Sequence, residues 1–172
     1  DTMLGEQLNP PSGDLPICYT RCPKNLDVVF IVDMSQSVIT TDERNAEIYG
    51  DFIETIMDTW WKMNDQLNKK TAFGLVSFAT DVATQFDLNQ DWELDEYLEF
   101  VDDYFVPENF GGQTNTLGAF WESIDVFDGS DHYNDTHWSR MAIMVTDGDP
   151  TIEPNGADYG PNPCEPEYTV NK

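Results

Sequence analysis

An uninterrupted apolar run that ends in an acidic residue constrains the fold of this chain more than any other feature. Residues 27–33 read Asp-Val-Val-Phe-Ile-Val-Asp. Five consecutive apolar residues without alternation are typical of a strand that is buried on both faces of a parallel sheet. Residues 71–79 and 138–146 also favour strands, and the second of these is followed by Asp147. The sequence therefore predicts a central, mainly parallel sheet.

Apolar residues at helical spacing predict the helices that cover this sheet. A first helix is predicted after Thr41 and Asp42, whose side-chain oxygens can cap its amino end. Its inner stripe is Ala46, Tyr49, Ile53, Ile56, Trp60 and Met63. A second inner stripe is Leu94, Leu98, Val101 and Phe105. Gly111 and Gly112 then break the chain, and a third helix is predicted at 114–127. The stripe that should face inward there is Leu117, Phe120, Trp121 and Ile124.

A short alternating strand at 82–88 completes the order strand, helix, strand, strand, helix, helix, strand. This order predicts an α/β domain with a Rossmann-like, doubly wound sheet and helices on both faces. We expect an irregular, Pro-rich leader at 1–25, the domain at 26–149, and a Pro/Gly-rich acidic tail or long loop at 150–172.

The charge balance excludes two classes of partner. Lys and Arg number 8 and Asp and Glu number 33, which gives a formal net charge of −25. Nucleic acids and anionic lipids are held by basic residues, so neither is an expected partner. The longest apolar runs are far shorter than the ~20 residues that cross a bilayer, so no membrane insertion is expected. With 40% apolar and 13% aromatic residues, the chain is expected to fold rather than stay disordered.

The cysteines and one glycosylation sequence indicate an extracellular or cell-surface location. Cys18 or Cys22 is expected to form a disulfide with Cys164, which would leave the third cysteine free or paired outside this sequence. Asn134 begins an Asn-Asp-Thr sequence, a candidate site of N-glycosylation in a secreted protein. Both features are typical of oxidising compartments.

Oxygen-bearing side chains follow the predicted strands where a doubly wound sheet binds its ligands, beyond the carboxyl ends. The three segments are Asp33-Met-Ser35-Gln-Ser37, Gly112-Gln-Thr114-Asn-Thr116 and Thr146-Asp147-Gly148. Each segment alone is also explained by helix caps and turns, since Ser and Thr cap helices and Asp-Gly forms turns.

Together, the three segments resemble the metal-ion-dependent adhesion site of von Willebrand factor type A (VWA) domains. The resemblance runs from Asp27 to Asp149 and implies one Mg²⁺ or Ca²⁺ ion. It also implies that Ser35, Ser37 and Thr114 bind the metal directly, while the aspartates act partly through water. One open metal position would then accept a carboxylate from a protein partner. The implied metal-site residues are Asp33, Ser35, Ser37, Thr114 and Asp147, and those expected on the rim are Gln36, Asn115 and Asp149.

The resemblance leaves a choice between functions. A metal-dependent adhesion or assembly module, not an enzyme, is the first interpretation. The alternative is a structural VWA unit of a matrix, filament or surface appendage, bound to neighbouring subunits, with an incidental metal site. A Mg²⁺-dependent phosphohydrolase with Asp33 as nucleophile is disfavoured, because Lys69 and Lys70 lie at the wrong end of the sheet to balance a phosphoryl group.

One departure from the family concerns the end of the domain. VWA domains continue past the Thr-Asp-Gly strand with further strands and a closing helix, yet only 25 residues follow Asp147. The strand at 138–146 would therefore lie at an open sheet edge, which folded proteins normally protect. We expect either a longer polypeptide or another chain that supplies a strand by β-augmentation.

Overall fold

The computed structural model describes residues 24–40 and 42–148. The elements, in chain order, are β1 (Asn25–Asp33), α1 (Gln36–Thr40), α2 (Arg44–Gln66), β2 (Thr71–Phe78), β3 (Val82–Phe86), α3 (Leu94–Tyr104), the 3₁₀ helix η2 (Pro107–Asn109), α4 (Thr116–Asp128) and β4 (Trp138–Val145). The expectations for the leader, the tail, the three cysteines, Thr41 and Asp149 fall outside the described residues and stay predictions.

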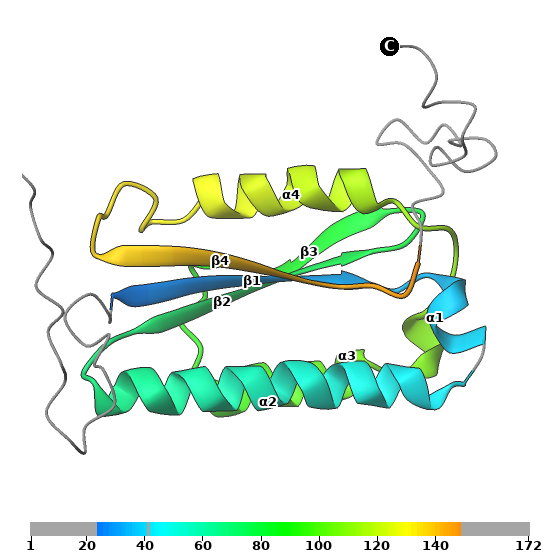
Figure 1. Ribbon diagram of the computed structural model, residues 1–172, viewed down its shortest axis with the longest axis horizontal. Coiled ribbons are helices and arrows are strands. Elements are labelled where there is room, and N and C mark those ends of the chain that lie inside the picture. Colours follow the sequence, from blue (N-terminus) through cyan, green and yellow to red (C-terminus); the bar gives the residue numbers. More distant parts are fainter. Residues whose placement is uncertain (1–23, 41, 149–172) are drawn as a thin grey trace, which may run out of the picture.

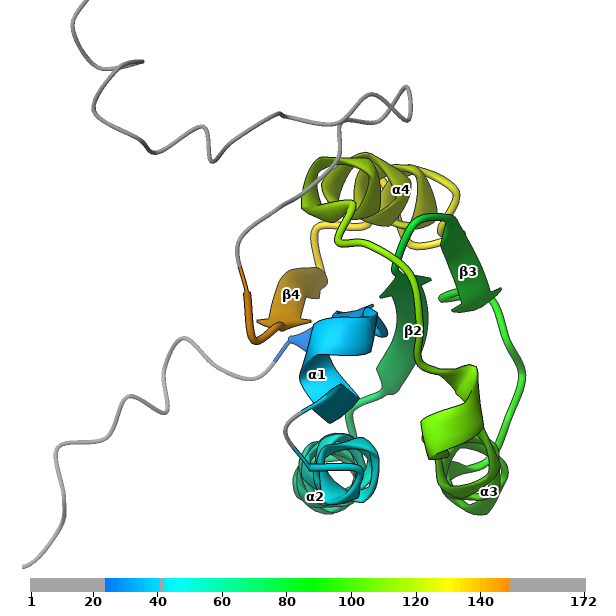
Figure 2. The same ribbon diagram turned by 90° about the vertical axis from the view of Figure 1, so that its right-hand side faces the viewer.

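The sheet confirms the predicted fold class. Its strand order is β3-β2-β1-β4. β1 pairs in parallel with both β2 and β4, whereas β3 pairs antiparallel with β2. Figures 1 and 2 show α2 and α3 against one face of the sheet and α4 against the other. The protein is therefore a mixed α/β domain with a mainly parallel sheet between two helical layers.

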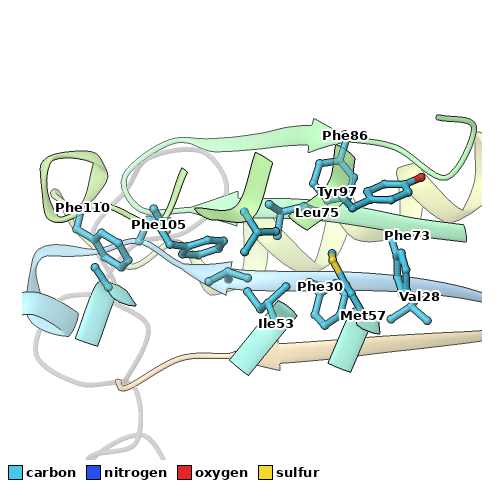
Figure 3. Packing of buried hydrophobic residues seen from close by; sticks show 14 of the residues in the cluster. Val28, Phe30, Ile53, Met57, Phe73, Leu75, Phe86, Tyr97, Phe105 and Phe110 are labelled. Atoms are coloured by element: carbon cyan, nitrogen blue, oxygen red, sulfur yellow. The ribbon is translucent and has the colours of Figure 1, made fainter. Parts of the chain in front are cut away.

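Central strand β1 supplies side chains to the cores on both faces of the sheet. Val28, Phe30 and Val32 belong to the core under α2 and α3, where Figure 3 shows Val28 and Phe30 near Met57 and Phe73. Val29 and Ile31 belong to the second core, which includes Ala119 and Val126 of α4. All five β1 residues are completely buried. Burial of each such side chain contributes about 1.5–3 kcal/mol, so the apolar run at 28–32 contributes strongly to the stability of both cores.

The prediction of which α4 residues face the sheet is wrong. Leu117, Phe120, Trp121 and Ile124 are 41–59% exposed. The buried residues of the helix are instead Ala119, Ser123 and Val126. Small side chains fit this face because α4 lies close to the sheet: a Cβ at Gly74 would lie 3.3 Å from a Val126 methyl carbon. The close packing at Gly74 thus turns the larger apolar residues toward solvent.

Several element boundaries also differ from the predictions. α2 begins at Arg44 after Glu43, and the Asp42 carboxylate accepts a hydrogen bond from the Arg44 backbone N–H (3.0 Å). The short helices α1 and η2 have only five and three residues. Elements of this length are too short to show helical periodicity, which is why the sequence did not predict them.

β4 lies at an edge of the sheet in the described part of the chain. It pairs only with β1 there. Residues 139–142 are all exposed, including Met141 at 42%. Open edges present unpaired backbone groups that folded proteins normally cover. The expectation that a further strand adds beside β4 stays a prediction. In the described ranges, no helix is both long enough and apolar enough to cross a membrane.

A buried carboxylate occupies the amino-terminal end of the central strand. Asp27 is fully buried, and one of its oxygens lies 3.1 Å from His132 Nδ1. The other oxygen, Oδ2, has no hydrogen-bond partner among the described residues. Burial raises the pKa of Asp27, and the hydrogen bond and charge of His132, with the charge of Arg140, offset part of that rise.

A raised pKa in the folded state means that folding favours the protonated carboxyl. The contribution of Asp27 to stability is therefore present below pH ~3.8 and lost as pH rises through the folded pKa. We compare the free energy of unfolding of Asp27→Asn with that of the wild type. The variant should become more stable relative to the wild type as pH rises from 3.5 to 7. The change should be about 1.4 kcal/mol for each pH unit by which the pKa of Asp27 in the folded state exceeds that in the unfolded state. Urea unfolding of both proteins across this pH range measures the difference.

Asp135→Asn is a control whose stability relative to the wild type should change with pH in the opposite direction. Hydrogen bonds from His137 lower the pKa of Asp135, so this variant should lose stability relative to the wild type over the same pH range. A difference between Asp27→Asn and wild type that does not change with pH would contradict the role given to Asp27.

Candidate metal centre

The candidate site lies at the carboxyl ends of β1 and β4. Asp33 is the last residue of β1, and Asp147 lies two residues beyond the end of β4. The two strands are parallel neighbours in which Val32 pairs with Val145. Their carboxyl ends therefore meet at one edge of the sheet, beside α1 at the right-hand end of Figure 1. This is the edge where doubly wound sheets bind ligands.

Asp33 is fully buried, and both of its carboxylate oxygens are held by the protein. Oδ1 accepts a hydrogen bond from the Ser35 backbone N–H at 2.9 Å. Oδ2 accepts one from the Thr146 hydroxyl at 2.7 Å. In the described residues, no Lys, Arg or His forms an ion pair with Asp33 or Asp147. Buried charges are normally paired or bound to a metal, so this carboxylate has the surroundings of a metal-site residue.

A chain of hydrogen-bonded oxygens connects the first predicted segment to the last. The hydroxyls of Ser35 and Ser37 lie 3.0 Å apart. The Ser37 hydroxyl donates to Asp147 Oδ1 at 3.1 Å. Ser35 is buried, whereas Ser37 and Asp147 are exposed. The fold thus brings four of the five predicted metal-site residues into one cluster that opens to solvent.

Thr114 lies on a loop that is tethered to this cluster by backbone hydrogen bonds. The Gly111 N–H donates to the Met34 carbonyl at 2.8 Å, and the Gln36 N–H donates to the Gly112 carbonyl at 3.2 Å. The loop is also held to the end of β2, where the Thr80 hydroxyl accepts from the Gln113 N–H at 3.0 Å. Thr114 itself is buried, with 4% of its surface exposed.

The three predicted rim residues have different surroundings. Gln36 is exposed at the start of α1, as expected of a residue that meets a ligand. Asn115 is only 6% exposed, and its side-chain oxygen accepts a hydrogen bond from the Gly118 N–H at 3.0 Å. The structure therefore uses Asn115 as the amino-terminal cap of α4, not as a solvent-facing rim residue. Asp149 lies outside the described ranges.

Two residues around the site were missed by sequence reasoning. Thr146 was quoted only as part of the Thr-Asp-Gly segment, yet it holds Asp33 Oδ2. Tyr49 was predicted as a core residue, yet burial and the charges of Asp147 and Asp33 raise its pKa to about 12. No spacing rule could have identified Tyr49, because only the fold brings α2 near the two aspartates.

The donor set of the cluster consists of hydroxyls and carboxylates. Such oxygen donors suit hard divalent cations, with hydrated Mg²⁺ or Ca²⁺ as the usual choices. Within the described ranges, no group of three or more His, Cys, Asp or Glu side chains is placed to hold a metal. Lys69 and Lys70 precede β2, whereas Asp33 pairs with Phe78 at the far end of that strand. The lysines therefore lie far from Asp33, as the argument against a phosphohydrolase expected.

Comparison with known proteins identifies the family. The family model of the von Willebrand factor type A domain matches residues 27–160 of this 172-residue chain. This chain belongs to the von Willebrand factor type A domain family.

Solved structures of similar fold come from a matrix protein and a pilus tip protein. Proximal thread matrix protein 1 from the mussel byssus superposes with a TM-score of 0.62 at 25% identity, over 75% of this chain and 32% of that chain. A form of that protein with a zinc-occupied metal-ion-dependent adhesion site has a TM-score of 0.61 at 23% identity, over 75% and 32% of the two chains. The vWF domain of the type V pilus tip protein Mfa5 from Porphyromonas gingivalis has a TM-score of 0.60 at 14% identity, over 76% and 40%. The chain thus spans well under half of these proteins.

The position of the Thr114 loop depends on Gly112. This residue has a φ of +82°, and a Cβ there would lie 2.5 Å from the Thr80 hydroxyl oxygen. L-residues with side chains are disfavoured at this φ by about 1–2 kcal/mol. We expect Gly112→Ala to lower the free energy of unfolding by about 1–3 kcal/mol, as measured by urea denaturation.

Gly111→Ala is the matched control in the same loop. Its added Cβ would meet only the Gln36 side-chain oxygen, at 4.0 Å, and its φ is not positive. Its stability should stay within about 0.5 kcal/mol of the wild type. Equal losses in the two variants would show that Gly112 has no special conformational role.

Proposed function

We propose that this chain is an extracellular, metal-dependent protein-binding module that acts in adhesion or assembly and has no enzymatic activity. In this proposal, a divalent cation lies among Asp33, Ser35, Ser37, Thr114 and Asp147. The cation keeps one position for a carboxylate of a protein partner. Membership of the VWA family supports the module, and the matrix and pilus tip neighbours support an extracellular setting.

The observation that carries the proposal is the buried Asp33 carboxylate beside a cluster of oxygen atoms. Neither it nor Asp147 has an ion-pair partner within the described ranges. A divalent cation would balance both negative charges at once. Because both Asp33 oxygens already accept hydrogen bonds from Ser35 and Thr146, the hydroxyls are the better direct ligands, with Asp33 acting from behind them.

The spacing of the oxygens fits either hard cation. An octahedral Mg²⁺ site with bonds of about 2.1 Å has ligand-to-ligand edges of about 3.0 Å. The Ser35–Ser37 and Ser37–Asp147 oxygen separations are 3.0 and 3.1 Å. Ca²⁺ with bonds of about 2.3–2.6 Å often has a pentagonal-bipyramidal shell, in which neighbouring ligands lie about 2.7–3.7 Å apart, so the same spacing also accepts Ca²⁺.

A metal-bridged contact also explains how a chain with a net charge of −25 could bind an acidic partner. The repulsion between the two proteins is long-range and is screened beyond about 8 Å at physiological salt. The bond between metal and carboxylate is local and is screened much less. The metal would therefore supply the attraction that the protein surface lacks.

A structural role in an assembly is the second candidate, and the exposed edge of β4 favours it. A strand from a neighbouring subunit, or from further along the same polypeptide, could pair with that edge. The apolar residues that α4 leaves exposed are Leu117, Phe120, Trp121 and Ile124. These side chains would form an apolar surface that the added segment could cover.

Ser37→Ala tests the cation site. Ser37 is exposed, so its loss should leave the fold intact. Mg²⁺ at about 100 times its Kd should stabilise the wild type by about 2.7 kcal/mol, and Ser37→Ala should require a higher Mg²⁺ concentration for the same effect. Thr40→Ala removes an exposed hydroxyl that bonds the Gln36 carbonyl in the same helix and should respond like the wild type. Identical Mg²⁺ responses of Ser37→Ala and wild type would exclude Ser37 as a ligand.

Binding to a surface that carries Glu-containing peptides tests the carboxylate mechanism. Wild-type protein with Mg²⁺ should bind these peptides but not the corresponding Gln peptides. Chelation by EDTA should abolish binding, while moderate salt should strengthen it because it screens the repulsion between the two acidic surfaces. Undiminished binding in EDTA would rule out the metal bridge, although not the fold.

A further inference from the structure

A cavity of about 410 Å³ lies at the end of the molecule opposite the candidate metal centre. Its walls come from the end of α2, the start of β2, the segment between β3 and α3, and the segment between α4 and β4. In Figure 1 this is the left-hand end, where the amino ends of β1 and β2 lie. We propose that this cavity binds a neutral saccharide.

Aromatic residues form one part of the cavity wall, beside charged and amide side chains. Trp61, Trp92, Tyr97 and Trp138 all line it, and they include three of the five tryptophans of the chain. Each of these three tryptophans is partly exposed, whereas Tyr97 is only 1% exposed, so the tryptophans supply the accessible ring surface. A pyranose ring presents flat C–H faces, and these pack against aromatic rings by dispersion and by attraction to the negative ring face. The wall therefore offers the type of surface that sugar rings contact.

The rings are held in place by other aromatic residues. Trp92 packs against Tyr97 in an edge-to-face arrangement, with ring centroids 5.2 Å apart. Trp61 stacks on Phe73 at 6.3 Å. Trp138 stacks on His132 with a centroid distance of 3.6 Å and an interplanar angle of 7°. Since these contacts fix the rings without a ligand, binding would not have to order them.

The loops that close the cavity are also fixed by hydrogen bonds. The Asn89 side chain donates to the Gly129 carbonyl at 2.9 Å and accepts from the Asp131 N–H at 2.8 Å. The Tyr97 hydroxyl donates to the Gln90 carbonyl at 3.3 Å. These bonds join the loop after β3 to the loop after α4 and to α3. The cavity is thus preformed, and its volume falls within the range of about 300–1,000 Å³ of small-molecule sites.

The polar side chains on the wall match a hydroxyl-rich ligand better than a charged one. No hydrogen bond or ion pair among the described residues uses the side chains of Asp65, Lys69, Lys70, Gln90, Asp91 or Asp131. This set contains both donors and acceptors, and each sugar hydroxyl can donate and accept. The wall carries four carboxylates, of Asp65, Asp91, Glu93 and Asp131, against Lys69 and Lys70, so an anionic ligand would be repelled. An uncharged saccharide avoids this repulsion and the cost of desolvating a charged group.

Titration of the whole chain with sugars in the presence of EDTA tests this proposal separately from the metal centre. The probes are the neutral disaccharides maltose, cellobiose, lactose and diacetylchitobiose, followed by tryptophan fluorescence and saturation-transfer NMR. We expect saturable binding of at least one of them. Asp91→Asn and Lys70→Gln should each bind it about fivefold more weakly, because each replaces a charge-assisted hydrogen bond with a neutral one.

Asp95→Asn is the matched control, because Asp95 is also exposed but does not line the cavity. It should bind the sugar as the wild type does. Glucosamine and glucuronate, compared with glucose, test the preference for a neutral ligand. The proposal is overturned by the absence of saturation with every neutral disaccharide, by equal weakening in Asp95→Asn and Asp91→Asn, or by tighter binding of either charged sugar than of glucose. Because EDTA is present in all these titrations, a failure of the proposed metal site would not change their outcome.

Discussion

The burial of β1 on both faces of the sheet is the constraint on which the rest of the structure depends. Its apolar residues, from Val28 to Val32, fill both cores, so the strand must be central and flanked by parallel neighbours. A strand in this position also carries the residues that flank its apolar run into buried surroundings. Those residues are Asp27 and Asp33, and both are fully buried.

The two aspartates show how the same side chain serves two purposes at opposite ends of one strand. Asp27 has a protein partner in His132, which belongs to the segment between α4 and β4. Asp33 has hydrogen-bond donors but no ion-pair partner within the described ranges. An uncompensated charge at the ligand-binding edge of a doubly wound sheet is what a cation site requires. The chemistry of the proposed function thus arises from the position of Asp33 in the fold.

The remaining surface divides into regions with separate proposed tasks. The proposed metal centre lies at the carboxyl ends of the strands, and the aromatic cavity lies at their amino ends. The edge of β4 and the exposed apolar face of α4 lie along the sides. A module of this kind could contact an acidic partner, a saccharide and a neighbouring strand without competition between the three, which suits a component of an extracellular assembly.

The sequence alone determined the fold class, because runs of buried-strand residues and helical stripes are local patterns that survive without tertiary information. It also identified the two segments that supply Asp33, Ser35, Ser37 and Asp147 to one cluster. The tertiary structure decided which face of α4 is buried, because that depends on how closely the helix lies to Gly74. It also decided that Asn115 caps a helix, that Thr146 holds Asp33 and that Tyr49 lies near the two aspartates. These outcomes depend on distances between segments far apart in the chain, and no local spacing rule contains such distances.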